Sequence, residues 1–151
     1  MHEIRTEIDV EATPEKIWSI LLNFSEYAQW NPFIRSIDGI ADQGSRLKVS
    51  IQPPGSGSMT FRPTLLAVVP GRELRWRGRV LLPGIFDGEH YFQIVPLAGE
   101  RVKFIQGEIF SGILVGMLKS SLDGKTKMGF IAMNKALKLL AEGKVKSGSA
   151  A

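Results

Sequence analysis

The sequence DGEHYFQIVPLAGERVKFIQGEIF, residues 87–110, contains the pattern on which the prediction of the fold is based. Apolar and polar residues alternate through 87–97 and again through 100–110, and this period of two is typical of half-buried strands. Ala98-Gly99 interrupts the alternation only briefly, as a tight turn does. We therefore predict an antiparallel hairpin whose turn lies at Ala98-Gly99-Glu100.

A turn centred on Gly99 also predicts which side chains share a face of this hairpin. It sets His90 opposite Glu108, Phe92 opposite Gln106 and Ile94 opposite Phe104. Together with Val102 and Phe110 these residues make a mostly apolar face, so we expect that face to point into the protein. Three polar side chains, those of His90, Gln106 and Glu108, would then lie in an apolar cavity.

Further alternating runs precede the hairpin. Strands are expected at 3–10 and near 33–40, 45–52, 59–69 and 73–82, separated by turn residues. With the hairpin they make seven strands, which form a meander.

The run 73–82 has two distinct faces. Leu74, Trp76 and Val80 lie on one face, and Arg75, Arg77 and Arg79 alternate with them on the other. The arginine face is predicted to be the solvated one.

Helical patterns flank the meander. Thr13 before Pro14 is typical of a helix start, and 24–30 is expected to form a second short helix that ends at Asn31-Pro32. After the hairpin, a long amphipathic helix is predicted to begin within 112–122 and to end near Gly143.

These elements predict one α+β domain, residues 1–143, and a flexible C-terminal tail, residues 144–151. A seven-stranded curved antiparallel sheet would wrap around the long C-terminal helix, with residues 3–10 paired to 100–110 and two short helices after the first strand. Because one helix cannot fill the concave side of such a sheet, a cavity is expected between them.

Five stretches support this architecture with a family resemblance. They are ATPEKIW (12–18), YAQWNPF (27–33), PGRELRWRG (70–78), HYF (90–92) and GFIAMNKAL (129–137). With them the chain resembles the START-like superfamily, also called SRPBCC, and within it the polyketide cyclase/dehydrase-like group. The resemblance implies a helix-grip fold with a cavity for a hydrophobic small molecule. It does not choose a function, because the superfamily includes lipid carriers, cyclases, hormone receptors, cochaperones and oxygenase domains.

Composition excludes several classes of protein. The 151 residues are 44% hydrophobic and 23% charged, as in ordinary globular proteins. The absence of cysteine excludes disulfides and thiolate metal sites. No apolar run reaches the length of a membrane span and no targeting signal is visible, so we expect a cytoplasmic protein without stable membrane insertion.

The net charge of +4 reflects one segment of the chain. Seven lysines and only two acidic residues lie between residues 119 and 146. Because they follow one helix and its tail rather than a groove-sized face, we do not expect nucleic acid as a partner. A partner protein with an acidic surface stays open.

The inventory of reactive side chains is short. We expect no metal site and no cofactor, because the chain has only two histidines and lacks the pairing of nearby histidines with a carboxylate that oxygenase-type sites use. Without cysteine or a GxSxG motif, no nucleophile is evident either. His90 and Glu108 remain as a pair with three possible roles. They could orient a ligand hydroxyl or carbonyl, act as general acid and base, or only satisfy each other's hydrogen bonds.

Nine side chains are predicted to contact a ligand: Phe61, Trp76, His90, Phe92, Phe104, Gln106, Glu108, Phe110 and Met133. Since aromatic residues inside a curved sheet are core by default, about half of the aromatic ones should reach it.

Three functions follow. The first is a carrier or sensor of a lipid, isoprenoid, quinone or polyketide-like molecule. The second is a cyclase or dehydratase that uses His90 and Glu108 as its acid/base pair. The third is an interaction protein similar to the cochaperones of the superfamily.

Overall fold

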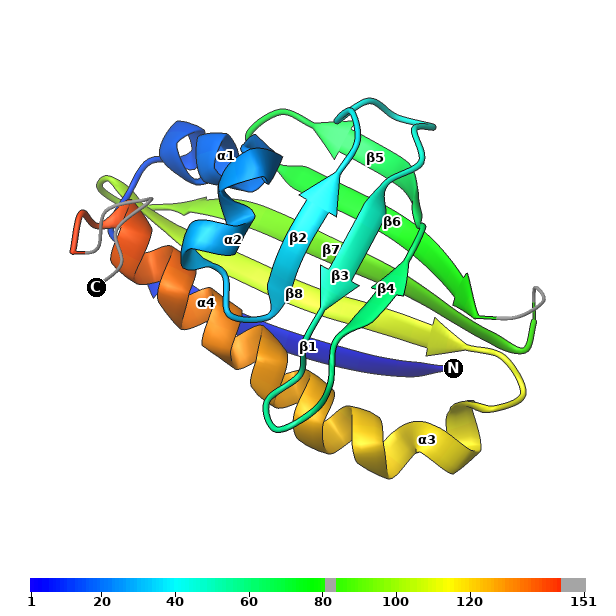
Figure 1. Cartoon of the computed structure of the whole chain (residues 1–151). Helices are drawn as coiled ribbons and strands as arrows, with labels where there is room; N and C mark the ends of the chain where they lie inside the picture. Colours follow the sequence, from blue (N-terminus) through cyan, green and yellow to red (C-terminus); the bar gives the residue numbers. More distant parts are fainter. Residues whose placement is uncertain (81–83, 145–151) are drawn as a thin grey trace.

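The computed structural model describes residues 1–80 and 84–144, which form eight strands in two antiparallel sheets (Figure 1). The strand order is β1-β8-β7-β6-β5 in the larger sheet and β2-β3-β4 in the smaller one. The larger sheet consists of β1 (His2–Val10), β5 (Thr64–Val69), β6 (Glu73–Val80), β7 (Phe86–Leu97) and β8 (Arg101–Ser111). The smaller sheet consists of β2 (Ile34–Asp38), β3 (Lys48–Ile51) and β4 (Met59–Phe61).

The prediction of a single seven-stranded sheet is wrong, and the segment 59–69 explains why. It was expected to be one strand but is divided into β4 and β5, which belong to different sheets. Pro63 lies between them, and a proline has no N–H to continue a ladder of hydrogen bonds. The sheets still meet there, because Leu47 N donates to Pro63 O over 2.8 Å. The last two residues of the predicted strand 73–82 lie outside the described residues.

The α+β class, the two short helical segments and the long C-terminal helix are confirmed. The helical elements are α1 (Pro14–Leu22), η1 (Phe24–Glu26), α2 (Tyr27–Trp30), α3 (Val115–Ser121), η2 (Leu122–Thr126) and α4 (Lys127–Ala141). Thr13 Oγ1 accepts from Lys16 N over 3.2 Å, which caps α1 as the sequence predicts. The C-terminal helix is not uniform: η2 is one wider π-helical turn between α3 and α4.

The C-terminal helix lies against the larger sheet, as the helix-grip expectation requires. β1 pairs with β8 over its full length, from His2 opposite Phe110 to Val10 opposite Val102. Figure 1 shows α4 running beside these two strands, and both contact it. The buried face of α4 contains Gly129, Phe130, Met133, Asn134, Leu137 and Ala141.

Gly129 allows a close contact between α4 and the loop before β2. A Cβ atom at this position would collide with the ring of Phe33. The same ring meets Phe130 edge-on, with centroids 5.5 Å apart. The missing side chain of Gly129 therefore lets the Phe33 ring lie close to the helix.

The outer face of β6 and β7 is an ion-pair ladder rather than a simply solvated arginine face. Arg75 donates to Glu89 over 2.7 Å and to Glu73 over 3.2 Å. Its guanidinium carbon also lies 4.8 Å from the ring centroid of Tyr91. Arg77 reaches Glu89 over 3.0 Å.

The C-terminal end of α4 is closed by backbone and side-chain contacts. Gly143 has a φ of 76°, which favours glycine, and Lys144 N donates to Leu139 O over 2.9 Å. One oxygen of Glu142 accepts from Glu11 N over 2.8 Å and from Lys138 Nζ over 2.6 Å. The predicted stop at Gly143 is confirmed, whereas residues 145–151 of the predicted tail lie outside the described residues.

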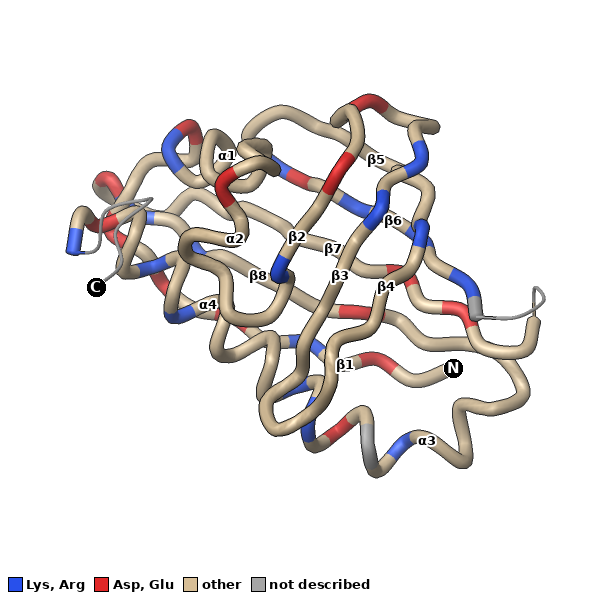
Figure 2. The backbone as a smooth tube through the Cα atoms, viewed as in Figure 1, with Lys and Arg blue, Asp and Glu red and all other residues tan. Residues whose placement is uncertain are grey.

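Figure 2 shows lysines at several positions along α4. Lys127 and Lys135 are exposed, as expected for a solvated face. Lys138 differs, because it is half-buried and also donates to Asp9 O over 3.0 Å. It ties the helix to β1 and is not a purely solvated charge.

Gly129→Ala is expected to destabilise the protein by about 1–3 kcal/mol, because the added methyl group must displace the Phe33 ring. Gly116→Ala in α3 is the matched control. A Cβ there meets no atom within 4 Å, so helix propensity should make it neutral or stabilising. Urea unfolding of both variants measures the difference, and equal free energies of unfolding would contradict the close contact.

Glu142 predicts a specific loss of stability in acid. The hydrogen bond from Glu11 N and the ammonium of Lys138 lower the pKa of Glu142 from 4.5 to about 2. A carboxylate with a lowered pKa stabilises the fold above its unfolded pKa, and this contribution disappears as the pH falls from 4.5 toward 2.

Glu142→Gln should therefore lower the melting temperature near pH 6 and flatten its decline below pH 4.5. Glu100→Gln, in the exposed β7–β8 turn, serves as the control and should follow the wild-type profile. If Glu142→Gln followed the wild-type profile, the contacts of Glu142 with Glu11 N and Lys138 would contribute nothing to stability.

Candidate functional site

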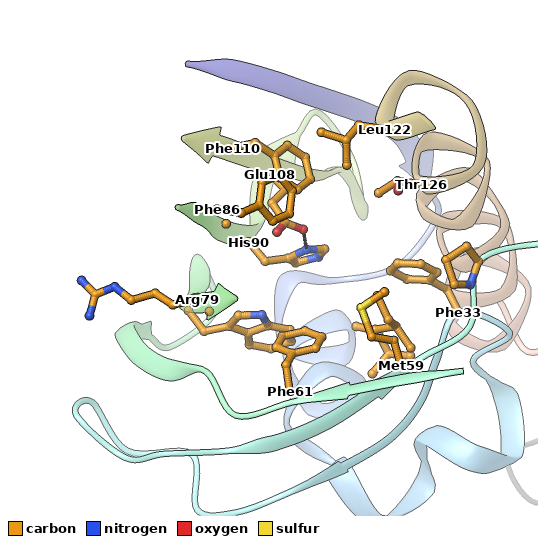
Figure 3. Close-up of a pocket in the computed structure, with 16 residues that line it drawn as sticks. Phe33, Met59, Phe61, Arg79, Phe86, His90, Glu108, Phe110, Leu122 and Thr126 are labelled. Carbon is orange, nitrogen blue, oxygen red and sulfur yellow. Dashed lines mark hydrogen bonds and ion pairs between the residues drawn. The ribbon is translucent and has the colours of Figure 1, made fainter. Parts of the chain in front are cut away.

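A pocket opens between the two sheets and the C-terminal helix, at the end of the β7–β8 hairpin that is remote from its turn (Figure 3). Its volume is about 140 Å³. Since one water needs roughly 10–15 Å³ of such space, the pocket has room for a small organic molecule or for part of a larger one. Its walls are mainly apolar.

Five of the nine predicted ligand-contact residues line this pocket: Phe61, Trp76, His90, Glu108 and Phe110. The other four are Phe92, Phe104, Gln106 and Met133, all of them completely buried and absent from the pocket wall. Apart from Phe61, which lies on β4 of the smaller sheet, both groups come from the larger sheet or from the helix that covers it. The difference is position along the strands: the second group lies deeper, in the core between α4 and the sheet.

The loop between α2 and β2 supplies wall residues that the sequence analysis missed. Phe33 and Ile34 line the pocket. Asn31 holds both in place, because its Oδ1 accepts from Phe33 N over 2.9 Å and from Ile34 N over 2.8 Å. The Asn31-Pro32 pair signalled this turn, although it was interpreted only as the end of a helix.

The smaller sheet and the π-helical turn also contribute. Ile51, Pro53 and Met59 line the pocket from the β3–β4 hairpin, and Leu122 and Thr126 line it from η2. None of these positions is marked by its local sequence. Ile51, Pro53 and Met59 reach the pocket because the second sheet folds over the first, and Leu122 and Thr126 reach it from the π-helical turn.

Phe86 completes the far wall. It lies one residue before the predicted strand and stacks on Phe110, with centroids 5.6 Å apart and an interplanar angle of 18°. A predicted strand that began one residue earlier would have included Phe86. Its side chain would then have been placed on the same face as His90.

His90 and Glu108 are the ionisable pair of the wall, and the predicted register is confirmed. The two residues are partners in the β7–β8 ladder, and His90 Nδ1 lies 2.9 Å from Glu108 Oε1. His90 is 4% exposed, whereas the Glu108 side chain is 20% exposed. Glu108 is therefore the member that faces the open space of the pocket.

Aromatic rings enclose the imidazole of His90. Trp76 stacks on it at 5.3 Å with an interplanar angle of 17°, and Phe130 meets it edge-on at 5.0 Å. Phe92 lies 4.8 Å away. These contacts hold the ring in one plane, so its two nitrogens point in fixed directions.

Gly88 makes room for Glu108. A Cβ atom at Gly88 would overlap Glu108 Oε2, so any larger residue would displace the carboxylate. Gly88 lies two residues before His90 on the same face of β7. Its position in the strand is thus explained by the polar pair.

A polar connection runs from His90 into the core. His90 Nε2 lies 3.0 Å from Gln106 Oε1, and Gln106 Nε2 lies 2.8 Å from Asn134 Oδ1. Asn134 Nδ2 in turn lies 2.8 Å from Thr6 Oγ1. Gln106 was predicted from the sequence to face the cavity, whereas Thr6 and Asn134 were not predicted as its partners, because only the packing of β1 and α4 brings them to it.

Within residues 1–80 and 84–144, no group of three His, Asp or Glu side chains is arranged to hold a metal ion. None of the helices in these ranges combines the length and the apolar character needed to cross a membrane.

Solved structures with the same fold are numerous. A START superfamily protein from Mycobacterium smegmatis matches with a TM-score of 0.71 and 22% identity over 96% of this chain and 100% of that one. The Zhui aromatase/cyclase from Streptomyces sp. R1128 matches with a TM-score of 0.72 and 16% identity over 99% of both chains. A protein from Thermus thermophilus, TTHA0849, matches with a TM-score of 0.73 and 15% identity over 96% of this chain and 100% of that one. At these identities the likeness is one of fold.

No curated protein matches the sequence. The sequence profile of one family does match, over residues 1–128, which is most of the chain. That family is described as polyketide cyclase / dehydrase and lipid transport. With its START-like fold, the chain therefore belongs to the polyketide cyclase/dehydrase and lipid transport family.

Proposed function

We propose that this protein binds a hydrophobic small molecule that carries a polar group, in the pocket between the two sheets and the C-terminal helix. One observation carries the proposal: in a mainly apolar wall, the Glu108 carboxylate, held by His90, meets the open space. An apolar pocket with few fixed polar groups is the usual form of a small-molecule site.

The two parts of the wall would act differently on a ligand. Rings such as Phe61, Phe86 and Phe110 remove apolar ligand surface from water, at about 25 cal/mol per Å². Glu108 would orient the ligand through one hydrogen bond, because its geometry is fixed by His90 and Gly88. Affinity would come mainly from the rings and orientation from the carboxylate.

Lipid, isoprenoid, quinone and polyketide-like molecules all fit this description. The family supports this chemistry in general terms. A role as carrier or sensor, a cytoplasmic location and a partner protein remain predictions from the sequence.

Native mass spectrometry of the purified protein tests the proposal directly. We expect an adduct with the mass of a small organic molecule that denaturation removes. Titration calorimetry with 2-naphthol, an apolar ring system with one hydroxyl group, should show saturable binding. The proposal would be refuted if no adduct were found and no apolar probe bound.

Phe61→Asp places a charge on the apolar wall and should weaken binding of 2-naphthol at least tenfold, since a buried unpaired charge is costly. Val95→Asp on β7 is the matched control. Val95 is 41% exposed and lies outside the pocket wall, so affinity should stay within about twofold. An equal loss of affinity in both variants would indicate that 2-naphthol binds outside this pocket.

A cyclase or dehydratase activity is the second candidate, and the 2.9 Å contact between His90 and Glu108 at the pocket favours it. Proton transfer by Glu108 would be the step that depends on this contact. Glu108→Gln should then reduce turnover of an aromatic polyketide-like substrate on the order of a hundredfold, while affinity changes by about tenfold or less. Unchanged turnover in Glu108→Gln would exclude proton transfer by Glu108 and leave ligand binding as the proposed function.

A further inference from the structure

The buried polar side chains behind the pocket form one continuous chain of hydrogen bonds. It passes from Glu108 through His90, Gln106 and Asn134 to Thr6. Gln106 is fully buried, Asn134 is 2% exposed and Thr6 is 8% exposed. Because buried polar groups must be paired, each link of this chain needs one donor and one acceptor.

Two backbone carbonyl groups fix the direction of the chain, because a carbonyl oxygen only accepts. Thr6 Oγ1 lies 2.8 Å from Gln106 O, so the single hydroxyl proton of Thr6 is donated there. Thr6 Oγ1 must then accept from Asn134, which turns Asn134 Oδ1 toward Gln106.

The second carbonyl gives the same direction independently. Gln106 Nε2 lies 3.4 Å from Phe130 O, and an amide oxygen in that place would face a carbonyl oxygen, which only accepts. The amide nitrogen of Gln106 therefore donates to Asn134 and Phe130, and its Oε1 faces His90.

His90 consequently donates through Nε2. An amide oxygen accepts only, so the 3.0 Å contact with Gln106 Oε1 requires a proton on Nε2. The contact between Nδ1 and Glu108 Oε1 needs a proton of its own. It lies between the two atoms, either on Nδ1 beside a carboxylate or on Oε1 as a carboxyl group.

In both placements Glu108 Oε2 carries no proton. Among the residues that the structure describes, none donates a hydrogen bond to it. The oxygen that remains available therefore offers only lone pairs.

We propose that the chain Thr6–Asn134–Gln106–His90 makes Glu108 Oε2 a permanent acceptor, so that the pocket selects apolar ligands with a hydroxyl group over ligands that offer only a carbonyl or ether oxygen. The ligand preference rests on the proposed function, whereas the proton arrangement does not. Gln106 and Asn134 are positioning residues in this scheme.

The proton arrangement is tested without a ligand by nitrogen-15 NMR of the imidazole rings at pH 7. The chain has two histidines, and a His2→Gln variant assigns the signals of His90. We expect His90 Nε2 to show the chemical shift of a protonated nitrogen. A protonated Nδ1 with an unprotonated Nε2 would overturn the arrangement.

Gln106→Met removes the acceptor and keeps an apolar side chain of similar length. We expect His90 to change to the form protonated only on Nδ1, which donates to the Glu108 carboxylate. Gln93→Met is the matched control, because Gln93 lies on the same pair of strands but bonds to Glu73 on the outer face. An unprotonated Nε2 in the wild type already decides against the proposal, even if Gln106→Met does not fold.

The ligand preference is tested by calorimetry with three naphthalene probes. We expect 2-naphthol to bind at least tenfold more tightly than 2-methoxynaphthalene and 2-naphthaldehyde, which lack a donor. Glu108→Met removes both carboxylate oxygens and should abolish the preference for 2-naphthol. In Glu108→Gln the amide N–H would donate to His90 Nδ1 and its oxygen would take the place of Oε2, so the order of the probes should stay the same. Equal affinities of the three probes would overturn the selection for hydroxyl groups.

If no probe binds, the proposed function fails together with the ligand preference. The NMR result still decides whether the chain of hydrogen bonds fixes the protons of His90. The two failures are therefore distinguishable.

Discussion

The hydrogen bonds of Asn134 hold the two layers of the protein in register. Asn134 lies on α4, and it connects Thr6 of β1 with Gln106 of β8. A buried amide that loses its partners costs about 1–3 kcal/mol, so α4 cannot rotate or slide on the sheet without that penalty. Apolar neighbours such as Phe130 and Leu137 would tolerate small shifts, but this contact does not.

The pocket follows from that fixed placement. With α4 anchored near the middle of β8, its side chains fill the space above Phe92 and Phe104. Farther along the strands, the π-helical turn and the smaller sheet line the remaining gap without filling it. The core and the pocket are thus two ends of one apolar layer, and the His90–Gln106 contact lies at their boundary.

Much of this arrangement was predictable from local sequence. Alternation and a short turn were sufficient for the register of His90 and Glu108, and helical spacing located the C-terminal helix. The division at Pro63 was missed because the residues on both sides of it, 59–61 and 64–69, are each typical of strands. Met59 and Leu122 could not be assigned to the pocket, since only the folding of the second sheet over the first and the π-helical turn bring them there. Phe92 and Phe61 look equivalent in sequence, yet one is core and the other is pocket wall.

The pairing of β1 with β8 joins the beginning of the chain to a strand about a hundred residues later. Glu142 and Asp123 then tie the C-terminal helical segment to Glu11 and His2. During synthesis, β1 has no partner until β8 has been made, and the helix has no place to dock until β1 has paired. The part of the sheet that α4 covers consequently stays exposed until α4 has been made, and transiently exposed apolar surface of this kind is prone to aggregation.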